Sequence, residues 1–327
     1  MTLEVQSFLR MNERSTRTNP VHEQQGQSDM RMEPAGEPIV NALSFDIEEY
    51  FHASALVHAF EGIQWDDLPV RIVANMDLLL DILDRKGVKA TLFILGWVAR
   101  RHPRLVRMAA SRGHEVACHG LSHTLVYQQT PAEFSAETAQ AKKILEDLTG
   151  EPVRGYRAAS FSITSRSIWA LEILASIGFA YDSSIFPILH DRYGIPGAPR
   201  MPYRIKLTDG KSLIEFPPST MRVAGVTLPV GGGGYFRLFP CGYTRLGLRR
   251  LNRREAMPMM FYSHPWEIDM KQPRGRVSAL TTFRHYHNLD KVQPRLEAML
   301  DTHRFAPVSQ VLACRSADLP DHRFGSV

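Results

Sequence analysis

The chain has 327 residues, of which 44% are hydrophobic and 22% charged, enough for one large globular domain or two smaller ones. Its formal net charge is +5, but the sequence contains no nucleic-acid-binding motif. Its three cysteines form no C-x-x-C pair, and this spacing excludes a disulfide framework and a cysteine metal site. No apolar stretch approaches the roughly 18 residues of a membrane span, and no secretory signal pattern opens the chain, so we expect a cytoplasmic protein.

The predicted elements alternate between strands and helices after a polar N-terminal segment. Residues 1–38 contain few large apolar side chains and are expected to form a disordered tail, whereas residues 39–327 are expected to form one domain. The first apolar run, 39–46, has the character of a buried strand. Further strands are predicted at 89–95, 114–119, 153–159 and 179–184, with helices at 69–87, 103–113, 130–150 and 165–178. Repeated strand–helix units predict an α/β fold with a parallel sheet, either a (β/α) barrel or a doubly wound sheet.

The second half of the chain is less regular. Strand and loop segments are predicted at 212–220, 226–240 and 257–269, with helices at 241–253 and 288–305. The basic run "RLGLRRLNRRE" (245–255) is typical of a solvated helix face, and contact with an anionic membrane, at its inner face, or with an anionic substrate is the alternative.

Residues that bind metals or move protons follow the predicted strands, and active sites of parallel α/β folds lie at the carboxyl ends of strands. The first strand ends in "SFDIEEYFH" (44–52), which packs three carboxylates into four positions. Like charges so close raise each other's pKa, so a neighbouring cation is expected. Because Asp46 and Glu48 are two positions apart, an extended backbone directs both to the same side and Glu49 to the other.

A pair of histidines follows the strand predicted at 114–119. His119 and His123 stand in "HGLSH", and a helical turn there would place both on one face, able to bind one ion. An isolated H-x3-H spacing is more often coincidental. Together with Glu48, however, the two histidines would give a metal three protein ligands and open positions, which is typical of a catalytic site.

Five short motifs in this order and spacing resemble those of the polysaccharide deacetylases of carbohydrate esterase family 4: "SFDIEEYFH", "HGLSH", "RAASFS", "YDSS" and "FYSHPWE". The segments "EFPPST", "GGGGYFRL" and "FRHYHNLDKV" further resemble the subfamily found in exosortase (PEP-CTERM) exopolysaccharide loci. The likeness covers roughly residues 40–312. It implies a deformed (β/α)7 barrel of the NodB-homology type and metal-dependent removal of an N-acetyl, sometimes O-acetyl, group from a sugar.

The resemblance also implies roles for individual residues. Asp46 resembles the catalytic base, Arg157 the arginine that orients it and His264 the general acid, while Glu48, His119 and His123 resemble the ligands of a divalent metal, commonly zinc. Two departures leave questions open. Ile47 separates the first two acids, so Glu49 remains an alternative ligand, and Ala159 stands where proline is usual, which leaves any oxyanion donor near Ser160 undecided.

Three residues are expected to bind substrate: Ser160, Tyr235 and Trp266. The glycines 231–234 are expected to form a flexible turn that supports Tyr235 near the sugar, and Trp266 either stacks on a sugar ring or packs. The expected substrate is an N-acetylated polysaccharide or oligosaccharide in exopolysaccharide biosynthesis, with no nucleic-acid partner and with the oligomeric state open. A small cyclic amide as substrate is one alternative. A non-catalytic carbohydrate-binding barrel is another, although mere binding would need no acid–base pair.

Overall fold

The structure, a computed structural model, describes residues 38–190 and 192–325. The predicted tail, residues 1–38, lies outside this part except for its last residue. One sheet has the strand order β10-β1-β2-β3-β4-β5-β7-β6-β12, and β11 also pairs with β1. Its strands are β1 (Asn41–Ile47), β2 (Thr91–Ile94), β3 (Glu115–Cys118), β4 (Gly155–Tyr156), β5 (Tyr181–Asp182), β6 (Tyr203–Lys206), β7 (Ser212–Glu215), β10 (Met260–Ser263), β11 (Phe305–Ala306) and β12 (Asp321–His322). Pairing within the described sheet is parallel except between β6 and β7.

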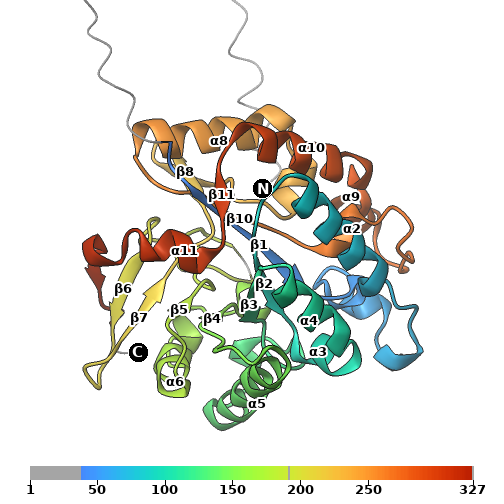
Figure 1. Ribbon diagram of the computed structural model, residues 1–327, viewed down its shortest axis with the longest axis horizontal. Coiled ribbons are helices and arrows are strands. Elements are labelled where there is room, and N and C mark those ends of the chain that lie inside the picture. The colour runs from blue at the N-terminus through green and yellow to red at the C-terminus, as the bar shows by residue number, and fades with distance from the viewer. Residues whose placement is uncertain (1–37, 191, 326–327) are drawn as a thin grey trace, which may run out of the picture. The chain divides into compact units, whose positions relative to one another are not determined.

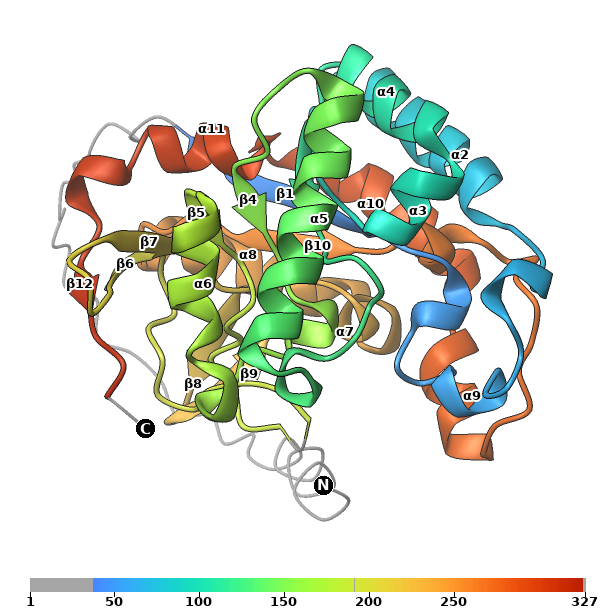
Figure 2. The same ribbon diagram turned by 90° about the horizontal axis from the view of Figure 1, so that it is seen from below.

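Helices surround these strands in both ribbon views (Figure 1, Figure 2). They are α2 (Ile72–Arg85), α3 (Gly96–Arg101), α4 (Pro103–Ser111), α5 (Pro131–Thr149), α6 (Ala170–Ile177), α7 (Gly234–Leu238), α8 (Cys241–Arg254), α9 (Ala279–Tyr286), α10 (Leu289–Thr302) and α11 (Val308–Ala313). The predicted α/β fold with a parallel sheet is confirmed. In the described ranges, no helix combines the length and the apolar content needed to cross a bilayer.

The ends of α5 show how local sequence fixes an element. Thr130 precedes the helix, and its Oγ1 accepts a hydrogen bond from the backbone N–H of Glu133 while the Glu133 carboxylate accepts one from the N–H of Thr130. Gly150 ends the helix with φ of 72°, a left-handed conformation that suits glycine. Both ends agree with the predicted helix at 130–150.

The sheet curves so that its two sides approach each other beyond β7. The N–H of Ser219 donates to the Met260 carbonyl at 3.4 Å, and the Met260 N–H donates to Ser219 Oγ at 2.7 Å. Strands β8 (Thr220–Val223) and β9 (Val226–Pro229) follow as a separate antiparallel pair. In residues 38–190 and 192–325, no continuous strand ladder joins β7 to β10, so the two sides meet through single hydrogen bonds.

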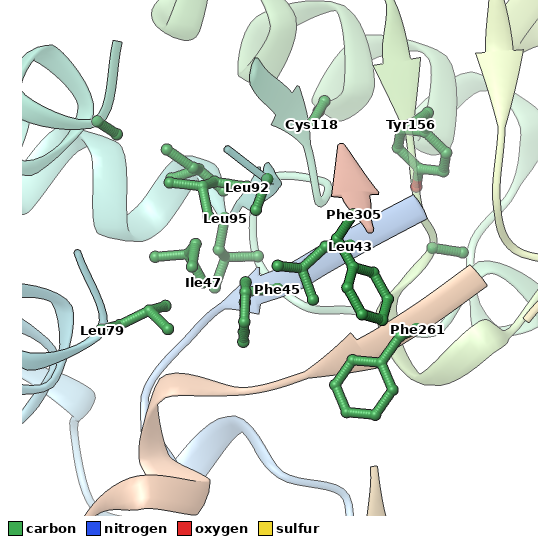
Figure 3. Close-up of a cluster of buried hydrophobic side chains, with 14 of the residues drawn as sticks. Leu43, Phe45, Ile47, Leu79, Leu92, Leu95, Cys118, Tyr156, Phe261 and Phe305 are labelled. Atoms are coloured by element: carbon green, nitrogen blue, oxygen red, sulfur yellow. The ribbon is translucent and has the colours of Figure 1, made fainter. Parts of the chain in front are cut away.

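The two faces of β1 have different surroundings. Figure 3 shows Leu43, Phe45 and Ile47 in one cluster with Leu92 of β2 and Leu95, and all five are at most 2% exposed. These residues alternate along β1, as expected for one face of a strand. This face packs against helices such as α2 and supplies the main hydrophobic core.

The opposite face of β1 changes from apolar to polar along the strand. Ala42, near its start, belongs to a second buried cluster with Phe93 of β2 and Val308 of α11. Two and four residues later, Ser44 and Asp46 are also buried but carry polar groups. The apolar cluster therefore fills the amino-terminal side of this face, and the carboxyl ends of the strands are left to polar chemistry.

The glycines 231–234 are held against β10 by hydrogen bonds to Tyr262. Residues 231–233 are buried, and the Tyr262 N–H donates to the Gly231 carbonyl at 2.7 Å while the Gly233 N–H donates to the Tyr262 carbonyl at 3.0 Å. Gly232 has φ of 124°, and a Cβ there would lie 1.9 Å from the Tyr262 carbonyl oxygen. Glycine is therefore required because this backbone lies directly against β10.

Candidate active site

Asp46 and Arg157 form a buried ion pair at the carboxyl ends of β1 and β4. Arg157 Nη1 donates to Asp46 Oδ1 at 2.7 Å and to Ser44 Oγ at 2.9 Å, and Nη2 donates to Ser183 Oγ at 2.9 Å. The guanidinium is fully buried and lies 4.1 Å from the centre of the Phe93 ring. Because every one of these contacts limits the movement of Arg157, the Asp46 carboxylate is held in one orientation.

Glu48, His119 and His123 come together beside this ion pair. Glu48 Oε2 lies 2.6 Å from His123 Nε2 and 3.5 Å from His119 Nε2. The two histidines are not on a helix, as the H-x3-H spacing suggested, but on a loop in which Gly120 has φ of 80° and His123 φ of 57°. A left-handed conformation costs energy for a residue with a side chain, so the fold holds His123 in place against a local preference.

The donor set of these three residues fits a divalent cation. One ligand atom from each lies within 4.8 Å of the others. His119 Nδ1 lies 2.9 Å from the Arg157 carbonyl oxygen, which can only accept, so Nδ1 carries the hydrogen and Nε2 is left with its lone pair directed at the cluster. Burial would raise the pKa of Glu48, but the charge of His123 above all, with the contacts of the neighbouring histidines, outweighs burial and holds the pKa well below its usual value. A carboxylate and two imidazoles suit zinc and similar ions.

Glu49 points away from the cluster and has a structural task. Its Oε1 accepts hydrogen bonds from the backbone N–H groups of Arg71 at 2.8 Å and Ile72 at 2.9 Å, at the start of α2. An acidic group there compensates for N–H groups that have no partner inside the helix. The side-to-side alternation predicted from the sequence therefore separates Glu48 from Glu49 in the structure.

His264 faces both acids of β1 from the end of β10. Its Nε2 lies 3.8 Å from Asp46 Oδ2 and 3.9 Å from Glu48 Oε1, and its Nδ1 lies 2.7 Å from Glu267 Oε1. Burial disfavours a charged imidazole, but Glu267, and then Glu48 and Asp46, outweigh this effect and raise the pKa of His264. The ring thus combines an anchored Nδ1 with an Nε2 that is directed into the site.

Trp266 is not placed to stack on a sugar, one of the two roles predicted for it. Its side chain is 4% exposed, and its Nε1 donates to Glu48 Oε1 at 3.1 Å. One face of the indole stacks on His264, with ring centres 4.7 Å apart, and the other on His285 at 4.6 Å. Because both faces are covered, Trp266 packs behind the site and supports Glu48.

Ser160 and Tyr235 lie on segments around the site but are partly exposed. Ser160 has φ of 51° and the next residue, Phe161, has φ of 54°, so two consecutive residues are left-handed. Ser160 Oγ lies 2.5 Å from Ser54 Oγ, which joins the segment after β1 to the segment after β4. The Tyr235 hydroxyl lies 3.5 Å from that of Tyr193. Nothing in these contacts assigns either residue to a substrate.

Sequence reasoning missed three residues that support the predicted ones. Ser183 binds Arg157, Glu267 binds His264, and Arg237 Nε donates to Glu267 Oε2 at 2.6 Å. A signal for Glu267 was present, because it stands three positions after His264 in "HPWE". Ser183 lies in "YDSS" and Arg237 in "GGGGYFRL", but their partners are distant in the chain, so these segments do not indicate which residue each side chain binds.

Comparison with known protein families divides the chain at the end of β5. Residues 62–181 match the family described as polysaccharide deacetylase. This match covers 120 of the 327 residues. Residues 183–313 match a domain of unknown function, DUF3473. The two matched segments meet in one sheet, because β5, where the first segment ends, pairs with β7 of the second segment.

Curated relatives resemble part of this chain. A chitooligosaccharide deacetylase from Bradyrhizobium sp. is 29% identical over 98 residues, which are 30% of this chain and 42% of the relative. A peptidoglycan deacetylase from Helicobacter pylori is 26% identical over 138 residues, 42% of this chain and 43% of the relative. The chain thus spans less than half the length of these relatives.

Solved structures share the fold across almost the whole chain. A Mycobacterium smegmatis protein described as a candidate polysaccharide deacetylase has a TM-score of 0.60 at 19% identity, covering 95% of this chain and 99% of that one. The Puue allantoinase has a TM-score of 0.57 at 15% identity, covering 92% of this chain and 99% of that one. At these identities the likeness establishes the fold alone.

Proposed function

We propose that the protein is a metal-dependent deacetylase that hydrolyses N-acetyl groups of a sugar polymer or its precursor. The observation that carries this proposal is the position of His264 Nε2, which lies 3.8 Å from the Asp46 carboxylate and 3.9 Å from the Glu48 carboxylate. A base, an acid and a possible metal-binding cluster thus border one space. The match of residues 62–181 to the polysaccharide deacetylase family and the names of the relatives favour a sugar amide as the bond that is broken.

The metal cluster consists of Glu48, His119 and His123. A divalent ion held by these side chains supplies Lewis-acid polarisation of the acetyl carbonyl and activation of the attacking water. Zinc is the proposed ion because two imidazoles and one carboxylate leave it with open positions. The Nδ1–H of His119, fixed by the Arg157 carbonyl, keeps the other ring nitrogen directed at the cluster.

Asp46 is the proposed general base. Arg157 occupies its Oδ1, so Oδ2, which faces His264, is the oxygen available to take a proton from water. Both side chains are buried, and the rigid pair keeps Oδ2 at a fixed place near the reacting atoms. Arg157 therefore positions the base without contacting the substrate.

His264 is the proposed general acid. Its raised pKa favours the protonated ring near neutral pH, and Nε2 is the nitrogen that faces the reacting space. An amine leaves an acetyl carbon readily only when it receives a proton. The order of events is proton removal from water by Asp46, attack on the acetyl carbon, and protonation of the sugar nitrogen by His264.

The test is acetate release from oligomers of N-acetylglucosamine by purified protein with one equivalent of zinc. We expect turnover by the wild type and, in the Asp46→Asn variant, retained zinc with turnover reduced about 10²-fold or more. Release from O-acetylated sugars and opening of a small cyclic amide are measured alongside. Turnover of the cyclic amide alone would replace the proposal by the amidohydrolase alternative, and binding of sugar without turnover would favour a non-catalytic barrel.

Two finer proposals concern the biological setting. We propose that the protein acts in exopolysaccharide biosynthesis, because the segments "EFPPST", "GGGGYFRL" and "FRHYHNLDKV" resemble those of the exosortase-locus subfamily.

We also propose contact of α8 with an anionic membrane surface. Arg245, Arg249 and Arg253 are exposed on α8 and form no ion pair within the described residues, and Leu246 between them is 58% exposed. Co-sedimentation with vesicles of phosphatidylglycerol, but not of phosphatidylcholine, would support this contact.

A further inference from the structure

We infer that Glu267 and Arg237 are positioning residues for His264, and that the segment of unknown function, residues 183–313, thereby builds the acid side of the active site. The inference rests on the proposed function, because it concerns the group that protonates the leaving amine. His264, Glu267 and Arg237 all lie within that segment, whereas Asp46, Glu48, His119 and Arg157 lie outside it.

Glu267 is tied to His264 by both backbone and side chain. Its Oε1 accepts hydrogen bonds from the His264 backbone N–H at 3.2 Å and from Ser263 Oγ at 3.2 Å, and lies 2.7 Å from His264 Nδ1. The carboxylate is fully buried. Burial would raise its pKa, but the charges of Arg237 and His264 outweigh burial and lower it to about 2. An ionised carboxylate can only accept hydrogen bonds, so His264 Nδ1 carries a hydrogen.

Arg237 holds the other oxygen of the same carboxylate. Its Nε donates to Glu267 Oε2 at 2.6 Å, and its Nη1 donates to the carbonyl oxygen of His285. Arg237 is 4% exposed and comes from α7, directly after the buried glycines that lie against β10. Arginine has no acceptor atom, so whatever stands at position 267 must present an acceptor to it.

The plane of the His264 ring is fixed by stacking. Trp266 lies between His264 and His285, with interplanar angles of 21° and 17°. His285 is itself buried, and its Nε2 lies 3.0 Å from the Gln272 side-chain oxygen. The stack prevents rotation of the imidazole, and the hydrogen bond to Glu267 fixes which nitrogen faces the site. The two constraints together present Nε2, not Nδ1, to the substrate.

This arrangement predicts an unusual effect of Glu267→Gln. Arg237 and the His264 backbone N–H can both only donate, so one of them must lose its acceptor. The charged Arg237 makes the stronger hydrogen bond and takes the glutamine carbonyl oxygen, which turns the NH₂ group to His264 Nδ1. An NH₂ group needs an acceptor, so Nδ1 must lose its hydrogen. The ring then becomes the neutral Nε2–H form, a far weaker acid than imidazolium. An unchanged fold with a wrong tautomer lowers the turnover of a triad enzyme by about 10⁴-fold, which shows the scale available to such an effect.

The experiment compares Glu267→Gln with Asp269→Asn. Asp269 is a matched control because it is also buried and paired with an arginine, Arg71, through hydrogen bonds of 2.7 and 2.8 Å, but has no contact with His264. We measure kcat, KM, bound metal and the ¹⁵N NMR signals of the His264 ring. For Glu267→Gln we expect kcat to fall about 10²-fold or more with KM and metal content unchanged, and the Nδ1 signal to move to that of an unprotonated nitrogen. For Asp269→Asn we expect none of these changes.

Two results would overturn the inference: a protonated Nδ1 in Glu267→Gln, or a kcat within about threefold of wild type. If Glu267→Gln does not fold, the wild type alone still provides a test, because in its neutral form His264 must then be the Nδ1–H tautomer. A neutral Nε2–H form in wild type refutes the inference. Absence of acetate release by wild type, in contrast, would refute the proposed function and leave the tautomer measurement as an independent test of the positioning.

Discussion

Glu48 and Glu49 are neighbours in the chain, but their carboxylates have entirely different partners. Glu48 Oε2 lies 2.6 Å from His123 Nε2, whereas Glu49 Oε1 accepts the backbone N–H groups at the start of α2. Both side chains are at least 97% buried, so neither charge is tolerated merely because water reaches it. The two residues should therefore respond to substitution in opposite ways.

Glu48→Gln should abolish stoichiometric zinc binding, because an amide is a poor replacement for a carboxylate ligand. Added zinc should raise the melting temperature of wild type, since a ligand that binds only the folded state stabilises it, and this increase should vanish in the variant. Metal analysis after dialysis and thermal unfolding with and without zinc provide the measurement. Full zinc occupancy in Glu48→Gln would remove Glu48 from the metal site.

Glu49→Gln should retain zinc but lower the free energy of unfolding by about 0.5–2 kcal/mol, the usual contribution of a side chain that caps a helix. The reason is the loss of a charged acceptor for the N–H groups of Arg71 and Ile72. Urea unfolding together with metal analysis checks both parts. Loss of zinc at unchanged stability would exchange the roles of Glu48 and Glu49.

Arg157→Met should destabilise the fold by about 3–5 kcal/mol, because the Asp46 carboxylate would remain buried without its partner. Arg157→Met combined with Asp46→Asn should recover much of this loss, since the uncompensated charge is then removed. Urea unfolding of the two single variants and the double variant gives the coupling free energy. Additive losses would mean that the ion pair is not the source of the effect.

A buried acid pair at β5 and β7 should make stability depend on pH. Burial raises the pKa values of both Asp182 and Glu215, and the charge of Asp182 raises that of Glu215 further. The folded state therefore binds more protons than the unfolded chain above the usual carboxyl pKa of about 4, so the pair's contribution to stability falls as pH rises from there. Glu215→Gln removes one titrating group but keeps a donor, and should flatten this fall.

The measurement is the free energy of unfolding in urea at about pH 4.5 and about pH 7.5. The change between these values should be smaller in Glu215→Gln than in wild type by more than about 1 kcal/mol, because one pKa unit corresponds to about 1.4 kcal/mol. Glu151→Gln, at an exposed position, should follow wild type. Parallel curves for Glu215→Gln and wild type would show that the pair does not retain its proton.

Gly232→Ala should destabilise the protein by more than about 3 kcal/mol or prevent folding, because the backbone is left-handed there and the new Cβ would collide with the Tyr262 carbonyl. Gly242→Ala is the control: no atom lies within 4 Å of the new Cβ and the position is in α8, so stability should be unchanged or slightly higher. Thermal unfolding distinguishes the two. Equal melting temperatures would contradict the close approach at Gly232.

The parts of the site that the sequence predicted are those that follow local rules. Asp46 and Glu48 were separated from Glu49 by the alternation of a strand, and the structure keeps this separation. The parallel strands that carry Asp46, His119 and Arg157 were visible as strand–helix units, so their approach at one edge of the sheet followed from the fold class.

The remaining features depend on contacts that no local pattern contains. His123 reaches the cluster through a left-handed loop, where the H-x3-H spacing suggested a helical turn. Trp266 could not be assigned from sequence because the coverage of its two faces by His264 and His285 depends on tertiary packing. The pairing of Arg237 with Glu267 has the same origin, since these residues belong to different elements.

The boundary between the two matched segments runs through a single network of interactions. Ser183 is the first residue of the second segment, and it holds Arg157 of the first, while the charge of Asp182 at the junction raises the pKa of Glu215 in the second segment. Neither segment therefore contains all the residues of the proposed reaction centre. Exchange of either segment between related genes would have to preserve both sides of these contacts, so the two are expected to be inherited as a unit, and separate expression of each should yield no activity until both are combined.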